Sequence, residues 1–153
     1  MDAKEERKIL ENHFKAYDDI CNQLDEQRYK WAELKNELYG IKPINYSGMP
    51  SSSSGEDRTL IFLERIEEVE NKIRGLNACK LEIQEKHLKE INYLDSLDSR
   101  RIIREIFLNH HNTSDLEKLM NYNRSNIYKL RKDAYSQFVN LIQKWTTLDS
   151  IGQ

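Results

Sequence analysis

Turn-forming residues are concentrated in one short segment of this 153-residue chain. Both prolines and three of the five glycines lie within residues 40–55, which read GIKPINYSGMPSSSSG. Gly40 and Pro43 predict that a preceding helix ends there, and the glycines, prolines and serines predict a loop over residues 40–58. Few residues elsewhere interrupt a helix, so we expect one long helix on each side of this loop.

The stretch before the loop has the pattern of one amphipathic helix. Residues 3–39 contain no glycine or proline, and an apolar residue recurs every seven positions: Leu10, Tyr17, Leu24, Trp31 and Leu38. This spacing predicts a single helix with an apolar stripe. The stripe either forms a coiled-coil seam or packs against another helix of the chain, because His13, Arg28 and Lys35 interrupt the second register.

The stretch after the loop predicts a second helix from about Thr59 to about Asn92, with acidic Glu56 and Asp57 at its positive end. Apolar residues keep a spacing of three or four through most of it, at Phe62, Ile66, Val69, Ile73, Leu76, Ile83 and Ile91. Neither helix could bury its stripe alone. We therefore expect an antiparallel helical hairpin.

The loop itself has two halves with different expected roles. The first half, IKPINYSGMP, is apolar enough either to pack onto the flanking helices or to serve as a docking motif for a partner. The serine run Ser51–Ser54 offers no apolar side chain, so it is expected to be mobile and dispensable.

The composition favours an all-α, cytoplasmic protein. Charged residues make up 33% of the chain and its mean hydropathy is -0.83, which suits solvent-washed helices. No segment approaches the roughly 18 apolar residues of a membrane span, and the N-terminus lacks the apolar stretch of a signal peptide. Cys21 and Cys79 are expected to be reduced structural thiols, with an inter-helix disulfide as the alternative.

The charge is distributed unevenly along the chain. Residues 1–97 carry 15 Lys+Arg against 20 Asp+Glu, whereas residues 98–145 carry 9 against 5. The last third is therefore the only region whose electric field would attract phosphate.

This basic region has the pattern of three helices separated by short polar breaks. The first apolar cluster ends at the polar residues 109–112, and Thr113 or Ser114 is expected to cap the second helix. A break at residues 121–124 precedes a longer third helix, whose apolar face comprises Ile127, Leu130, Ala134, Phe138, Leu141 and Ile142. A short helix, a tight turn and a long helix are typical of a helix-turn-helix, whose last helix enters the DNA major groove.

The start of the third helix carries the residues we expect to contact DNA. N-terminal residues of a recognition helix face base edges, and nearby cations meet phosphates. The predicted DNA-binding residues are Arg124, Ser125, Asn126, Tyr128, Lys129, Arg131 and Lys132. Charge and spacing alone fit an ordinary solvated basic helix of a small bundle equally well.

Residues 97–141 resemble region four of sigma factors. In that resemblance Leu116 and Met120 match the second helix, and Asn121 takes the place of the usual turn glycine. Asn123 matches the serine that caps the third helix, and Ile127 matches the apolar residue that anchors this helix. Glu117 departs from the pattern, because it stands where the two helices normally approach through a small residue.

Nearly the whole chain is similar to the ArpU/RinA-like family of phage late-gene transcriptional regulators. The similarity covers the two long helices, the IKPINYSGMP segment and a C-terminus ending near the family's VYRLR, matched here by residues 127–131. The resemblance implies a DNA-binding activator of phage or mobile-element late genes, with promoter or operator double-stranded DNA as its partner. Direct contact with host RNA polymerase is left open.

The expected organisation is a helical oligomerisation region over residues 1–94 and a DNA-binding domain over residues 95–153, most simply in a homodimer. We expect no catalytic residues, no metal and no cofactor. The neighbouring His110 and His111 are interpreted as a polar turn, with a phosphate contact as the alternative. The rival functions are a helical protein-interaction module and a small terminase-like packaging subunit.

Overall fold

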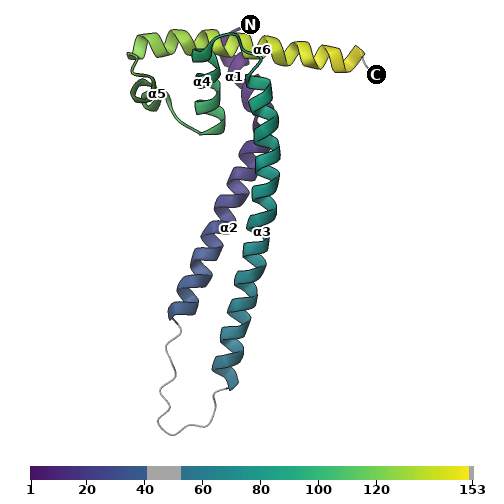
Figure 1. Ribbon diagram of the computed structural model, residues 1–153, viewed down its shortest axis with the longest axis vertical. Helices are drawn as coiled ribbons and strands as arrows, with labels where there is room; N and C mark the ends of the chain where they lie inside the picture. The colour runs from purple at the N-terminus through teal and green to yellow at the C-terminus, as the bar shows by residue number, and fades with distance from the viewer. Residues whose placement is uncertain (41–52, 152–153) are drawn as a thin grey trace. The chain divides into compact units, whose positions relative to one another are not determined.

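The computed structural model describes the backbone of residues 1–40 and 53–151 and the side chains of residues 1–40 and 57–149. The part of the chain so described is all-helical and contains no strand, which confirms the expected all-α class (Figure 1). Its elements are α1 (Ala3–His13), α2 (Lys15–Gly40), α3 (Ser53–Ile91), α4 (Leu97–Ile103), the π-helical turn η1 (Arg104–Leu108), α5 (Thr113–Met120) and α6 (Arg124–Ile151).

Two predicted helix boundaries were wrong. The expected single helix over residues 3–39 is interrupted at Phe14, whose φ of -95° and ψ of 5° depart from helical values. Phe14 is fully buried between other rings, so the irregularity coincides with the point where the chain enters the core. The second long helix begins at Ser53 rather than near Thr59. Serine is favoured at helix starts, so the helix can begin within the serine run.

The IKPINYSGMP segment, Ser51 and Ser52 lie outside the described residues, so both interpretations of that segment remain predictions. Ser53 and Ser54 belong to α3 and are not part of a loop.

The described contacts divide the chain into two compact units. Unit 1 comprises Met1–Asp18 and Glu82–Gln153, and unit 2 comprises Asp19–Leu81. This division differs from the expected one into residues 1–94 and 95–153. The reason is that α1 packs against α6, which places the N-terminus with the C-terminal helices.

The core of unit 1 is built around α6, which contacts α1, α4 and α5. The Phe14 ring stacks against Phe107 and Phe138, with centroids 4.8 and 5.7 Å away. Other fully buried side chains of the unit come from α1, α4, α5, α6 and the turn after α3, among them Leu10, Ile102, Ile103, Leu116, Ile127, Ala134 and Leu94. Apolar burial on this scale fixes α6 on one face and leaves the opposite face to solvent.

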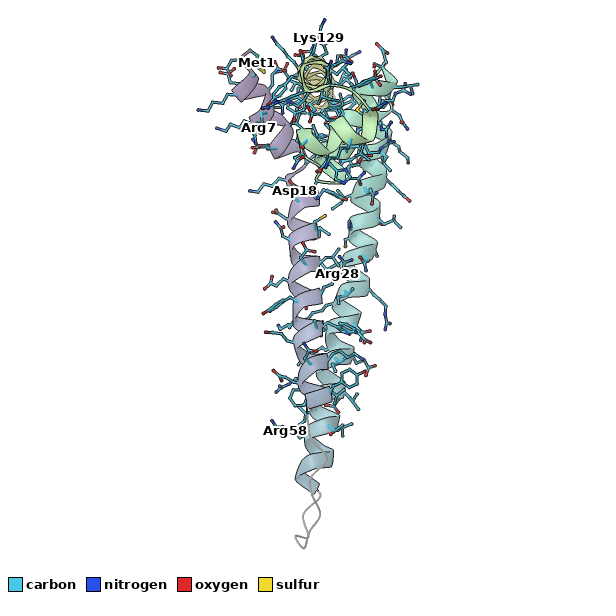
Figure 2. All side chains as sticks on the ribbon, turned by 90° about the vertical axis from the view of Figure 1, so that its left-hand side faces the viewer. Met1, Arg7, Asp18, Arg28, Arg58 and Lys129 are labelled. Carbon is cyan, nitrogen blue, oxygen red and sulfur yellow. The ribbon has the colours of Figure 1, made fainter. Side chains whose placement is uncertain are left out.

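Unit 2 consists of the remaining parts of α2 and α3. Its buried side chains are Leu24, Phe62, Ile66 and Val69, and the Trp31 indole Nε1 donates a hydrogen bond of 3.0 Å to Glu70 Oε1. Nitrogen- and oxygen-tipped side chains project along the described length of both helices (Figure 2). Cys21 is half-buried, Cys79 is exposed, and both are free thiols, so the cysteines are reduced as predicted, but the exposure of Cys79 differs from the structural role expected of it.

Candidate nucleic-acid interface

The turn between α5 and α6 has the local geometry that the sequence predicted. Asn121 ends α5 in the left-handed conformation, with φ 56° and ψ 39°. Asparagine tolerates this conformation better than most residues, so it can replace the glycine usual at such a turn. Asn123 Oδ1 accepts a hydrogen bond of 2.8 Å from the Asn126 backbone N–H and so caps the start of α6.

Asn121 carries a testable consequence for stability. Asn121→Gly is expected to leave the free energy of unfolding nearly unchanged, because glycine adopts the left-handed conformation freely. Asn121→Val should lower it by roughly 1 to 2 kcal/mol, since a β-branched residue is strained there. Urea unfolding measures both, with the exposed Lys118→Ala on α5 as the control. Equal stability of the valine and glycine variants would contradict the assigned turn.

The cap of α5 differs from the prediction. Neither Thr113 nor Ser114 caps this helix. Asn112 does so, accepting from the Asp115 N–H at 2.8 Å while its own N–H donates to the Asp115 carboxylate at 3.0 Å. Asparagine is among the best capping residues, and an acidic residue three positions later completes a reciprocal capping box.

Side-chain bonds from α4 hold the turn in place. Arg101 Nη2 donates to the Leu119 carbonyl at 3.0 Å, and the Tyr122 hydroxyl donates to Asp98 Oδ2 at 3.3 Å. Leu116 and Met120 of α5 are buried, whereas Glu117 remains half-exposed. These two hydrogen bonds hold α4 against the end of α5 and the turn that follows it.

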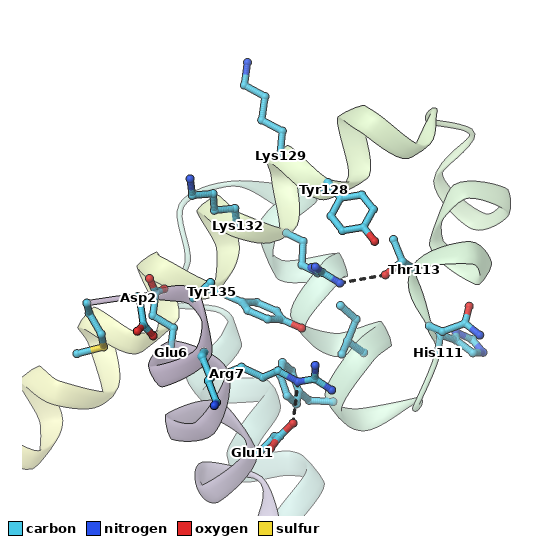
Figure 3. A pocket seen from close by; sticks show the side chains of 17 residues that line it. Asp2, Glu6, Arg7, Glu11, His111, Thr113, Tyr128, Lys129, Lys132 and Tyr135 are labelled. Atoms are coloured by element: carbon cyan, nitrogen blue, oxygen red, sulfur yellow. Dashed lines mark hydrogen bonds and ion pairs between the residues drawn. The ribbon is translucent and has the colours of Figure 1, made fainter.

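The predicted DNA-binding residues lie in the first turns of α6. Arg124, Ser125, Asn126, Lys129 and Lys132 are exposed, and Tyr128 retains 42% of its surface. The buried Ile127 and Ala134 mark the face of α6 that meets the core, and the exposed residues lie outside that face. Lys129 and Lys132 extend away from the neighbouring helices (Figure 3). These side chains can be reached by a macromolecule without disturbing the core.

Arg131, one of the predicted contact residues, also makes contacts within the chain. Its Nη1 donates to Thr113 Oγ1 at 3.1 Å, which links α6 to the start of α5 (Figure 3). Its guanidinium also lies 4.7 Å from the centroid of the Tyr128 ring and 5.8 Å from that of Tyr135. Arg131 is therefore half-buried and positions Tyr128 as well as carrying charge.

Tyr128 lies between two cations. The Arg124 guanidinium is 5.6 Å from the ring centroid, on a helix position four residues earlier. Hydrogen bonding to Arg124, together with the positive charges of Arg124 and Arg131, lowers the pKa of the Tyr128 phenol. The same hydrogen bond raises the pKa of Arg124. The result is a cationic surface with an aromatic ring at its centre, of the kind that meets phosphate and sugar groups.

The cationic surface of α6 ends where α1 begins to cover it. Ser136 donates its hydroxyl to the Glu6 carboxylate at 2.9 Å, and Arg7 pairs with Glu11 at 2.9 Å. A groove of about 990 Å³ lies between α1 and the start of α6, and its charged lining residues are Asp2, Lys4, Glu6, Arg7 and Glu11 together with Lys129, Arg131 and Lys132. Cations therefore outnumber carboxylates in the groove, so the groove is continuous with the cationic surface that forms the candidate interface.

Both histidines of the break before α5 have carboxylate partners. His110, at φ 56°, lies 2.8 Å from Asp18 through Nε2, and His111 Nδ1 lies 2.9 Å from Glu105 Oε2. Burial raises the pKa of Glu105, but hydrogen bonds from Asn109 and His111 outweigh it, so the net pKa is lowered. The interpretation as a polar turn fits this geometry, and a phosphate contact remains a prediction.

Sequence analysis missed a second cluster of titratable groups, in the core of unit 1. His13 Nε2 and His87 Nδ1 lie 3.0 and 2.6 Å from the same oxygen, Glu90 Oε1. Burial raises the pKa of Glu90, but hydrogen bonds and charge from the two imidazoles more than offset this and lower it to about 2. Two features of the sequence could have indicated the cluster. His87 and Glu90 lie three residues apart near the end of α3, and His13 is a polar residue among the apolar positions of α1.

No helix in the described part of the chain is long and apolar enough to cross a membrane. Comparison with protein-family models, curated proteins and solved structures found no match for this chain. The expected membership of the ArpU/RinA-like family therefore stays a prediction.

Proposed function

We propose that this chain is a sequence-specific DNA-binding transcriptional regulator, an activator of phage or mobile-element late genes. In this proposal α4, α5 and α6 form a helix-turn-helix of the sigma region-four type, and α2 with α3 forms an antiparallel hairpin used for oligomerisation. Its partner is promoter or operator double-stranded DNA. The assignment to late genes rests on the family resemblance, whereas the proposed DNA contact rests on the residues of α6.

One observation carries the proposal: the first two turns of α6 combine an anchored inner face with a free cationic outer face. Ile127 is fully buried, while Arg124, Asn126 and Lys129 are exposed. A recognition helix needs both properties, because it must be held rigidly while its N-terminal side chains reach base edges.

A genome-wide binding map tests this function directly. The full chain, expressed in a host that carries a related phage or mobile element, is cross-linked to DNA and the bound fragments are sequenced. We expect a few sharp peaks upstream of late operons. Peaks restricted to packaging-site DNA would favour the terminase-like alternative, and uniform background would contradict specific DNA binding.

Exposed apolar side chains on unit 2 support the proposed oligomer. Leu60, Ile61 and Leu63 of α3 each leave about half of their surface exposed, and Tyr29 of α2 leaves more. Apolar residues grouped in this way are typical of protein interfaces. The same observation suits the alternative of a helical protein-interaction module, so the occupant of this surface needs a test of its own.

We expect a homodimer at micromolar concentration by light scattering, since two-fold DNA readers gain affinity from paired half-sites. The double variant Leu60→Ser and Leu63→Ser should shift the mass toward the monomer, because both side chains lie on one face of α3. Leu81→Ser, which removes an equally exposed leucine elsewhere on α3, is the matched control. A strict monomer, both free and with DNA, would contradict the expected dimer.

A further inference from the structure

The cluster of His13, His87 and Glu90 joins two helices that are far apart in the sequence. His13 is the last residue of α1, and His87 and Glu90 lie in the last two turns of α3, so 77 residues separate His13 from Glu90. One ligand atom from each of the three side chains falls within 4.8 Å of the other two. The arrangement does not depend on the proposed DNA-binding function.

We infer that His13, His87 and Glu90 form a binding site for a divalent transition-metal ion, with Zn²⁺ as the best fit. Two imidazole nitrogens and one carboxylate oxygen are a common three-ligand set for zinc, with a fourth position left to water. Histidine nitrogen also suits Co²⁺ and Ni²⁺, so the site should accept these ions as probes.

The distances are compatible with such an ion after a small adjustment. Ligand atoms of a tetrahedral site with bonds near 2.0 to 2.1 Å lie roughly 3.3 Å apart. The nitrogen-to-oxygen distances here are 3.0 and 2.6 Å. A metal ion therefore requires these two distances to lengthen by roughly 0.3 and 0.7 Å, which a rotation of the Glu90 carboxylate can supply.

The surroundings of the cluster favour a bound cation. His87 is 5% exposed, and its ring centroid lies 4.5 Å from that of Phe14. Phe138 and Trp145 approach His13, with ring centroids 5.7 and 6.4 Å away. A carboxylate enclosed in this way gains more from a metal ion than it would in water, because the low local dielectric strengthens the attraction. The partial exposure of His13 leaves a path for the ion and for a water ligand.

The alternative is a polar cluster in which both imidazoles simply donate hydrogen bonds to Glu90. The two arrangements differ in protons: hydrogen bonding needs the facing nitrogens protonated, whereas a metal ion needs them deprotonated. Zinc binding therefore requires the hydrogen on each facing nitrogen to leave or to move to the other ring nitrogen, and it should raise the melting temperature of the full chain.

The test uses isothermal titration calorimetry of the full chain with Zn²⁺, and visible absorption of the Co²⁺ complex to report tetrahedral coordination. We expect one ion per chain with a dissociation constant in the micromolar range or tighter. His87→Gln and His13→Gln should each weaken binding at least tenfold, which corresponds to loss of one ligand. His111→Gln, at a partly exposed histidine that also pairs with a carboxylate, is the matched control and should bind zinc normally.

His13→Gln protects the test against loss of folding, because the His13 side chain is 20% exposed and tolerates substitution better than the buried His87. Circular dichroism confirms that each variant is folded before titration. The inference fails if the wild-type chain binds no Zn²⁺ tighter than about 100 µM. It also fails if zinc binding survives unchanged in folded His13→Gln, since the metal would then bind elsewhere.

Discussion

Ile127→Asp is expected to unfold unit 1 at room temperature. Ile127 is fully buried on the face of α6 that meets α4 and α5. The substitution removes the burial of a large aliphatic side chain, worth about 1.5 to 3 kcal/mol, and places an unpaired carboxylate in the core. Together these effects should lower the free energy of unfolding by more than about 4 kcal/mol. Circular dichroism and urea unfolding of the full chain measure the loss.

Ser125→Asp is the matched control, because it introduces the same charge two residues earlier on an exposed position. A carboxylate in the first turn interacts favourably with the helix dipole, so stability should change little. The two tryptophans allow the units to be followed separately, since Trp145 belongs to unit 1 and Trp31 to unit 2. A folded Ile127→Asp variant with an unchanged Trp145 signal would show that α6 is not anchored through Ile127.

The double variant Arg124→Ala and Lys129→Ala is expected to lose operator affinity by roughly thirtyfold or more. Both side chains are exposed in the first two turns of α6, so their removal leaves the core intact. One of them at a base edge and the other at a phosphate would together account for a loss of this size. Fluorescence anisotropy with a labelled operator duplex measures the affinity, and circular dichroism checks the fold.

Two single variants distinguish the loss of a phosphate contact at the proposed interface from the loss of one positive charge elsewhere on α6. Lys132→Ala should weaken binding to all sequences and reduce the slope of log affinity against log salt by about 1, as loss of one phosphate contact does. Lys144→Ala removes the same charge from an exposed position near the other end of α6 and should have little effect. If the double variant binds operator DNA as tightly as Lys144→Ala does, α6 is not the recognition helix.

The positions of the helices could be predicted from local sequence patterns. The seven-residue repeat correctly predicted the burial of Leu10, Tyr17 and Leu24, because a regular helix presents such residues on one face. The roles of Asn121 and Asn123 at the turn could also be predicted from local sequence. The left-handed conformation of Asn121 and the capping bond of Asn123 each involve residues no more than three positions apart. Trp31 and Leu38 continue the stripe but are only half-buried.

The boundaries were less predictable, since several residues compete for one role. Asn112 and Thr113 are both competent caps, and Asp115 gives Asn112 the advantage through a reciprocal bond. The interruption falls at Phe14, whose ring packs against Phe107 and Phe138, about a hundred residues away. A helical pattern gives no indication of such a contact.

The His13, His87 and Glu90 cluster could not be predicted for the same reason. Its members become neighbours only when α1 packs beside the end of α3, and no spacing rule connects residues 77 positions apart. Arg131 is a related case. Its basic side chain suggested a DNA contact, whereas its bond to Thr113 depends on how α5 lies against α6.

The measurement that tests the central claim most directly is the specificity ratio of the full chain at physiological salt. A duplex enriched by repeated selection from a randomised library is compared with a shuffled duplex of the same composition. Specific DNA-binding proteins typically bind their sites at least roughly a thousandfold more tightly than other DNA. We predict a ratio of that order for the wild-type chain and its collapse in the Arg124→Ala and Lys129→Ala variant. Equal affinity of the wild-type chain for both duplexes, or failure of any sequence to be enriched, would contradict the proposed function.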